Sequence, residues 1–286
     1  MKKLIILCVA AIVLCLFTVN AKAVFIYDID KDPGFVLYGN LWQNSPAMQA
    51  ALGTPLAAMY CGPVAVTNSF RYLERMYPNV YGLNGLTGGN LVGTAVALGN
   101  LMGTNVVNGT WADNLIWGKR QYIENRLPGR TIYEAQYWPT WGWTVPGVAQ
   151  PAWVRSVVPT WNWLWDQLVA CEDVEILLTY KSEGGGHFVT VKSFHWNDLN
   201  EDGFIDATEG ATIDFVDPLT GAVAVASIND EGINAGLPCM QVNYLQGFQQ
   251  VPVNAWITMA VKESIPEPAT IILLCLGGMM LRRKKA

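Results

Sequence analysis

Three residues far apart in the chain have side chains suited to covalent hydrolysis: Cys61, His187 and Asp217. A thiolate attacks a carbonyl carbon, an imidazole carries the proton, and a carboxylate holds the imidazole in the required orientation. Each residue also has an ordinary alternative. A cysteine can pack like a small apolar residue, a histidine at a strand start can be a surface or packing residue, and Asp-Pro is a common polar turn.

The segment around Cys61 predicts the helix that would position its thiol. It reads YCGPVAVTNSFRYL, and Pro63 suits the first turn of a helix because its missing N–H is not needed there. Val66, Phe70 and Leu73 then recur at steps of four and three, which is typical of a helix docked on a core. We therefore expect Cys61 at a helix N-terminus, where partial positive charge and free N–H groups favour the thiolate.

His187 follows three glycines and begins a predicted strand over residues 187–194. The strand-like run at 174–180 precedes it, so the two form a hairpin. The chain contains only one other histidine, His195. His187 is the better candidate for a base, because the glycines leave its imidazole uncrowded.

Asp217 directly follows a third predicted strand, over residues 211–216. If this strand pairs with the His187 strand, Asp217 can reach the far nitrogen of the imidazole. It would then hold the ring in one tautomer and stabilise its cation.

A twelve-residue acidic loop lies between those two strands, and every ligand position of an EF-hand calcium loop is filled by an oxygen donor. Positions one, three, five, seven, nine and twelve are Asp198, Asn200, Asp202, the Phe204 carbonyl, Asp206 and Glu209, with Gly203 at the turn. Strand-like flanks replace the usual helices, so the loop resembles the isolated calcium loops of dockerin-type extracellular proteins. We expect a structural Ca²⁺ that clamps a long strand connection.

Both ends of the chain carry export features. Residues 1–23 combine Lys2 and Lys3, an apolar run and a small-x-small cleavage pattern, as in a signal peptide. Residues 265–286 contain Pro-Glu-Pro, an apolar transmembrane segment and a terminal basic cluster, and they resemble the PEP-CTERM sorting signal of Gram-negative bacteria. The resemblance implies cleavage by an exosortase. We therefore expect an exported chain, at the cell surface or outside the cell, that is held in the inner membrane only until this cleavage.

The remaining body is strongly acidic. Seven of the 18 Lys and Arg residues lie outside residues 24–268, whereas all 23 acidic residues lie within them, which gives residues 24–268 a formal charge of about −12. This balance argues against nucleic acid or anionic lipid as a partner. Three cysteines remain in the body, and Cys171 with Cys239 is the natural disulfide pair if Cys61 is free.

Cys61-Gly62-Pro63 on a helix, the strand Gly186 to Val191 and Asp217-Pro218 together resemble papain-like cysteine peptidases. The group that cleaves double-glycine leader peptides, with its exported peptidase-like relatives, is the most similar. The resemblance implies an α+β domain over residues 24–262, in which a helix bearing the Cys packs on an antiparallel sheet bearing the His and Asp. It also implies Cys61 as nucleophile, His187 as general base and acid, and Asp217 as orienting residue.

One part of the papain-like pattern is missing: the oxyanion-hole glutamine, six residues before the nucleophile, is replaced by Pro55. Gln49 and Gln43 lie further back and would need a different loop to reach the site. The leading hypothesis is an exported Cys-His-Asp peptidase. The alternatives are an inactive surface or matrix protein of the same fold that binds peptide or glycan, for which the tryptophans of residues 131–165 are candidates, and a transamidase.

Overall fold

The computed structural model describes residues 25–182 and 184–265. The predicted signal peptide and the apolar run near the C-terminus lie outside these ranges. The helices are α2 (Pro46–Leu52), α3 (Thr54–Ala57), α4 (Cys61–Met76), α5 (Pro78–Tyr81), α6 (Leu91–Leu101), α7 (Ala112–Arg126) and α8 (Trp161–Val169). The strands are β1 (Phe25–Asp30), β2 (Ile132–Tyr137), β3 (Val154–Arg155), β4 (Asp173–Tyr180), β5 (Gly186–Asp198), β6 (Thr212–Asp217), β7 (Ala222–Asn234), β8 (Leu237–Gln246) and β9 (Val251–Ser264).

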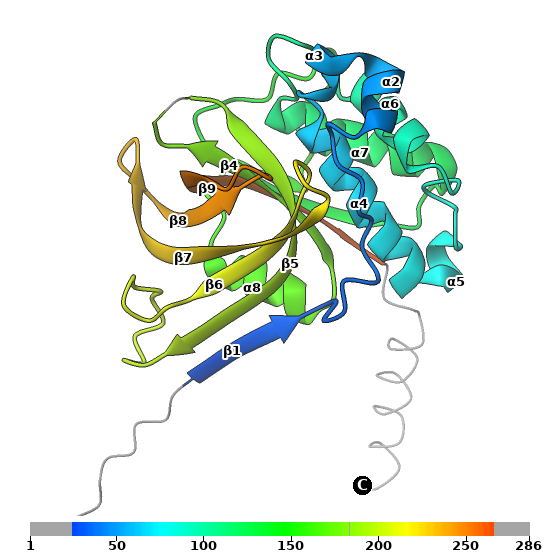
Figure 1. The fold of residues 1–286 in the computed structure, drawn as a ribbon. Coiled ribbons are helices and arrows are strands. Elements are labelled where there is room, and N and C mark those ends of the chain that lie inside the picture. The colour runs from blue at the N-terminus through cyan, green and yellow to red at the C-terminus, as the bar shows by residue number, and fades with distance from the viewer. Residues whose placement is uncertain (1–24, 183, 266–286) are drawn as a thin grey trace, which may run out of the picture.

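Six antiparallel strands close into a barrel (Figure 1). Each strand from β4 to β9 pairs with the next, and β4 also pairs with β9, which closes the ring. β1 extends the sheet beside β5, and β2 extends it beside β9. Closure leaves no free edge in the ring, so its strands are protected from pairing with another chain.

Strand residues alternate between two cores, as the two-residue period of a strand requires. On β5, Val189, Val191 and Phe194 belong to the core inside the barrel, to which α8 adds Trp161 and Leu164. The opposite face of the sheet contributes to a second core, in which it packs against the helices.

Helices α2 to α7 form a layer on one side of the barrel (Figure 1). α4 is the central helix of this layer, and Val66, Phe70 and Leu73 are fully or almost fully buried, as the periodicity predicts. Thr190 of β5 donates a hydrogen bond to the Ala65 carbonyl at 2.9 Å, which fixes α4 against the strand that carries His187.

The elements on either side of the site match the sequence predictions closely. The predicted strand over 174–180 lies within β4, the predicted strand over 187–194 lies within β5, and the acidic loop connects β5 to β6. β2 and the β7–β8–β9 meander were not predicted.

The predicted disulfide is wrong in this structure: Cys61, Cys171 and Cys239, the cysteines within the described ranges, are all free. Cys171 follows α8, where its carbonyl accepts hydrogen bonds from Tyr72 and Tyr77. Cys239 lies on β8, opposite Gly232 of the neighbouring strand β7. An odd count of thiols suggested a pair, but a count contains no information on distance.

Candidate active site

Cys61 is the first residue of α4, and the close approach of this helix end to β5 depends on Gly62. A Cβ at Gly62 would lie 3.0 Å from Leu115 and 3.2 Å from Phe188, which is tighter than ordinary side-chain packing. The Cys-Gly-Pro sequence thus brings the helix N-terminus, with its free N–H groups, directly onto the strand that begins with Gly186 and His187.

His187 and Asp217 meet at one end of the barrel. His187 shares the strand parity of Val189 and Val191, and Asp217 shares that of Phe215, so both side chains project toward the inner side of the sheet. His187 Nε2 lies 2.7 Å from Asp217 Oδ1, and both side chains are buried. The sequence predicted this contact, and the β5–β6 pairing produces it.

Asp217 is itself held in place by backbone donors. Its Oδ1 accepts the Leu219 N–H at 2.8 Å, and its Oδ2 accepts the Gly247 N–H at 3.3 Å. Burial alone would raise the pKa of Asp217, but the hydrogen bond and charge of His187 and these two N–H groups hold it below the ordinary value. Asp217 is therefore a carboxylate that stabilises a protonated imidazole.

Cys61 is half-buried and lines the same cavity as His187. Burial alone would raise the pKa of the Cys61 thiol, yet His187 and the N–H groups of Phe188 and Gly62 lower it overall. Burial opposes the charge on His187, but Asp217 and Cys61 raise the pKa of His187 to about 9. A lowered thiol pKa beside a raised imidazole pKa favours a thiolate next to an imidazolium, which is the reactive form of a cysteine nucleophile.

Gln43 enters the site from the segment before α2, a position that the sequence did not favour. Its backbone N–H donates to the Pro218 carbonyl at 2.8 Å, which ties this segment to the turn after Asp217. Its side chain is buried, and Nε2 donates to the Ala58 carbonyl at 2.5 Å. Gln43 and Cys61 line the same cavity, whereas Gln49 bonds the Asn44 carbonyl and does not line it.

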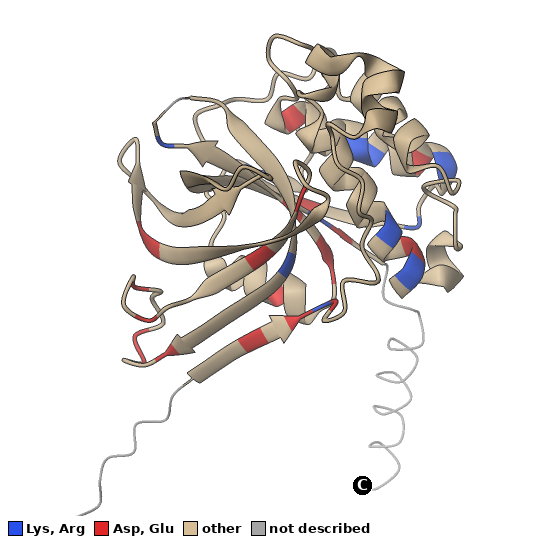
Figure 2. Ribbon diagram, viewed as in Figure 1, with Lys and Arg blue, Asp and Glu red and all other residues tan. Residues whose placement is uncertain are grey.

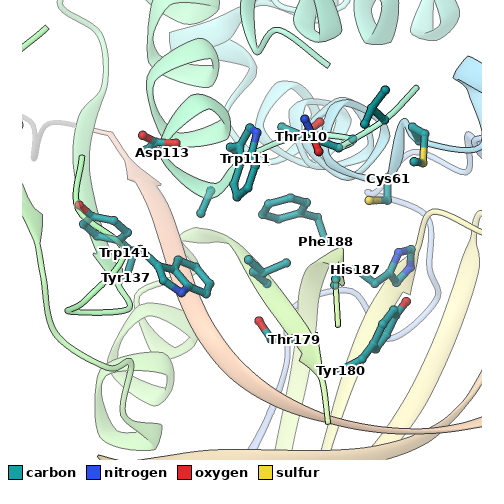
Figure 3. Close-up of a pocket in the computed structure, with 18 of the residues that line it drawn as sticks. Cys61, Thr110, Trp111, Asp113, Tyr137, Trp141, Thr179, Tyr180, His187 and Phe188 are labelled. Carbon is teal, nitrogen blue, oxygen red and sulfur yellow. The ribbon is translucent and has the colours of Figure 1, made fainter. Parts of the chain in front are cut away.

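The cavity beside Cys61 has a volume of about 750 Å³, within the usual range for a ligand site. Figure 3 shows Cys61 and His187 at one end of it and Tyr137 and Trp141 at the other, with Trp111 and Phe188 between them. The tryptophans of residues 131–165, which the sequence offers as candidates for ligand binding, divide between the core and the cavity. Trp138, Trp161 and Trp163 are buried, and Trp141 is 40% exposed at the cavity.

The acidic loop holds its side chains by local hydrogen bonds. Asp198 accepts the N–H groups of Glu201 and Gly203 at 2.6 and 3.1 Å. The Asn200 amide lies 3.1 Å from Asp202 and 3.5 Å from Asp206.

Glu209 closes the loop. Its carboxylate accepts the Leu199 N–H at 2.9 Å and Trp196 Nε1–H at 2.8 Å. The carboxylate, amide and carbonyl oxygens of the loop are suitable ligands for calcium. To bind the ion, the Glu209 carboxylate would have to release its hydrogen bonds from Leu199 and Trp196.

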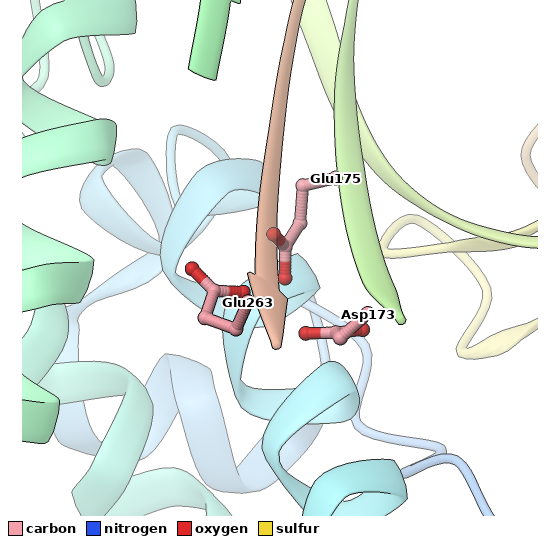
Figure 4. A group of neighbouring side chains, drawn as sticks. All are labelled: Asp173, Glu175 and Glu263. Carbon is pink, nitrogen blue, oxygen red and sulfur yellow. The ribbon is translucent and has the colours of Figure 1, made fainter. Parts of the chain in front are cut away.

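A second acidic group lies between the helices and the sheet: Asp173 and Glu175 on β4 and Glu263 on β9 (Figure 4). In the described part of the chain, these are the acidic side chains whose oxygens gather within 4.8 Å, as a metal site would require. All three are ion-paired to the fully buried Lys119 of α7, at 3.2 Å for Asp173. The Lys119 ammonium therefore takes the place that a metal ion would have among these carboxylates. The ion pairs join α7 to β4 and β9.

One family model matches the chain, that of the PEP-CTERM protein-sorting motif, at residues 264–285. No curated protein and no solved structure matches the chain. The match confirms the predicted sorting signal, and it defines the protein as an exported, exosortase-sorted protein of a Gram-negative bacterium. Within the described ranges, no helix is both long and apolar enough to span a membrane.

Proposed function

We propose that this exported protein is a cysteine peptidase in which Cys61 attacks a peptide bond, with His187 as acid and base. The observation that carries the proposal is the 2.7 Å contact between His187 and Asp217, together with the position of Cys61 beside His187 in one cavity (Figure 3). Asp217 engages Nε2, which leaves Nδ1 for the thiol. The resemblance to papain-like peptidases, including their α+β fold, supports the same assignment of roles.

In the first half of the reaction, the Cys61 thiolate forms a bond to the carbonyl carbon of the peptide. The His187 imidazolium then donates its proton to the leaving nitrogen, the C–N bond breaks, and a thioester remains on Cys61. In the second half, neutral His187 takes a proton from water, the hydroxide oxygen attacks the thioester, and the carboxylic acid leaves. Thiolate and imidazolium are restored.

Gln43 is the candidate for stabilising the oxyanion formed in both halves. The Ala58 carbonyl fixes Nε2 and takes one of its two hydrogens, so the second is free to donate. The Cys61 backbone N–H, at the open end of α4, supplies another donor. This assignment fills the role that Pro55 cannot fill.

For the acidic loop we propose a structural Ca²⁺ held by Asp198, Asn200, Asp202, Asp206, Glu209 and the Phe204 carbonyl. Their spacing and the mutual approach of Asn200, Asp202 and Asp206 support it. The ion would neutralise the carboxylates and tie the end of β5 to the start of β6.

The test is cleavage of a library of internally quenched peptides by the exported chain and by Cys61→Ala, with Cys239→Ala as the matched control. We expect turnover by the wild-type chain and by Cys239→Ala, and none by Cys61→Ala. Equal activity of all three proteins, or none in any of them, would refute the enzyme. Incorporation of an added amine into a glutamine peptide would show a transamidase instead.

A further inference from the structure

The cavity beside Cys61 has a predominantly aromatic and aliphatic wall away from the reactive groups. Trp111, Trp141 and Val107 line it, although they are 58%, 40% and 77% exposed. Phe188 and Tyr137 continue the same wall (Figure 3). Exposed apolar side chains that gather at a cavity mark a site where apolar groups of a partner are bound.

Trp111, Val107 and Trp141 come from segments outside the helix and strands that carry Cys61, His187 and Asp217. Trp111 is the N-cap of α7, and Val107 lies in the tight turn closed by Asn105 and Gly109. Trp141 lies in the connection after β2, which Thr144 fastens to Asp113 at 2.6 Å. The aromatic wall is therefore fixed in place by specific contacts.

The charges of the cavity exclude small charged substrates. Its lining contains no Lys or Arg among the described residues, and its imidazolium, His187, is already paired with Asp217 at 2.7 Å, so a free α-carboxylate would find no uncommitted cationic partner there. The N-terminus of α7 is a positive helix end, but Asp113 already occupies its first turn. Asp113 is buried and accepts both the N–H and the hydroxyl of Thr144, so it is not free to bind a substrate amine.

We infer that the cavity binds an internal stretch of polypeptide, with an aromatic or branched aliphatic side chain seated between Trp111 and Trp141. A free amino acid, a free chain terminus or an acidic side chain does not fit. The position of the bond to be cleaved rests on the proposed function, but the binding preference does not. Trp111 and Trp141 determine this specificity.

The test measures binding of peptides, blocked at both termini, to the Cys61→Ala chain by calorimetry. The peptides differ at one central position, which is Phe, Leu, Ala or Asp, and the Phe peptide is also tested with free termini. We expect the blocked Phe and Leu peptides to bind at least tenfold more tightly than the Ala, Asp and free-terminus peptides. Trp111→Ala and Trp141→Ala should each reduce this preference severalfold, since aromatic contacts add affinity beyond burial.

Trp117→Ala is the matched control, because Trp117 lies on the same helix outside the cavity, where it contacts Arg120. It should leave the preference unchanged. Equal binding of the Phe and Asp peptides, or binding of a polysaccharide but of no peptide, would overturn the inference. Selective peptide binding without cleavage by the wild-type chain would refute the proposed peptidase and leave the binding site standing.

Discussion

At the residue scale, the reactivity of Cys61 depends on groups that no other described cysteine has. The pKa of Cys239 is raised to about 11, chiefly by burial. Cys61 is also partly buried, but His187 and two backbone N–H groups reverse the effect of burial on its pKa. The difference lies in the position of Cys61 at a helix N-terminus opposite a buried imidazole.

Gln43 provides a residue-scale prediction about the oxyanion. Gln43→Ala should reduce kcat by about 10² to 10³, because a donor to the developing negative charge is lost. Labelling of Cys61 by iodoacetamide should be unchanged, since Gln43 is not a partner of the thiol. Gln49→Ala is the matched control and should retain full activity. Equal activity of both variants would remove Gln43 from the mechanism.

Local sequence predicted Cys61 and His187 but not Gln43, and the reason is physical. Gly-Pro after Cys61 and the glycines before His187 restrict the backbone locally, so each position can be inferred from its neighbours. Gln43 lies 18 residues before Cys61. It reaches the site through its contact with Pro218, which is distant in sequence.

At the element scale, the hairpin of β5 and β6 carries both His187 and Asp217, so its connecting loop affects the site. Ile205 of that loop is buried in the barrel core, and its carbonyl accepts the Asp230 N–H of β7 at 2.8 Å. The loop is therefore an integrated part of the barrel rather than a free surface segment.

Calcium in this loop makes an element-scale prediction. EDTA should lower the melting temperature of the wild-type chain by roughly 5 to 10 °C, because an ion present at about 100 times its Kd contributes about 3 kcal/mol. Asp202→Ala should melt at the lower temperature with or without EDTA. Glu201→Gln changes a charge at a position that does not bind the ion and should keep the EDTA response. A wild-type melting curve that ignores EDTA would exclude calcium.

The positions of the strands were easier to predict from the sequence than the pairing between strands. The β-branched runs at 174–180 and 187–194 identify strands by composition alone. The pairing of β4 with β9 joins Glu175 to Val261 across much of the chain, and no local pattern encodes it. For the same reason the ion pairs of Lys119 with Asp173, Glu175 and Glu263 were not predicted. Asp173 and Glu175 are two residues apart on a strand and so share one face, but nothing in the local sequence indicates their partner.

At the scale of the whole molecule, charge is divided unevenly. Acidic residues mark the barrel and its loops, while the helical layer holds several of the basic residues (Figure 2). The buried group around Lys119 lies between the two parts, with three carboxylates to one ammonium. Burial, followed by the charge of Asp173, raises the pKa of Glu175 to about 7 despite Lys119.

This buried group predicts how stability depends on pH. The folded pKa of Glu175 lies above its unfolded value of 4.5, so folding takes up a proton. The stabilisation is complete below pH 4.5 and is lost as the pH rises through 7. The free energy of unfolding should therefore fall by up to about 3 kcal/mol between pH 5 and pH 8.

Glu175→Gln retains the shape of the side chain and removes its titration, so urea denaturation of this variant should show a flatter pH profile than that of the wild-type chain. Glu201→Gln, on the surface loop, should show the wild-type profile. A Glu175→Gln profile as steep as the wild-type one would place the pH dependence elsewhere.

The place where the described chain ends, at Ile265, predicts that the protein does not remove its own tail. Cys61 begins α4, whose 16 residues span about 24 Å. The described chain ends beside the other end of α4 (Figure 1), with Ile265 packed on the helical core. Cys61→Ala should therefore be exported and trimmed to the wild-type mass in its host. Accumulation of the untrimmed chain would show self-processing.

The central claim, that His187 and Asp217 hold Cys61 as a thiolate, is tested most directly by the pH dependence of iodoacetamide labelling at Cys61, followed by mass spectrometry. A free cysteine labels roughly 80-fold faster at pH 8 than at pH 6, because its pKa is about 8.5. We predict less than a tenfold change for Cys61 in the wild-type chain and a return to the steep dependence in His187→Ala. A steep wild-type profile that His187→Ala leaves unchanged would contradict the claim.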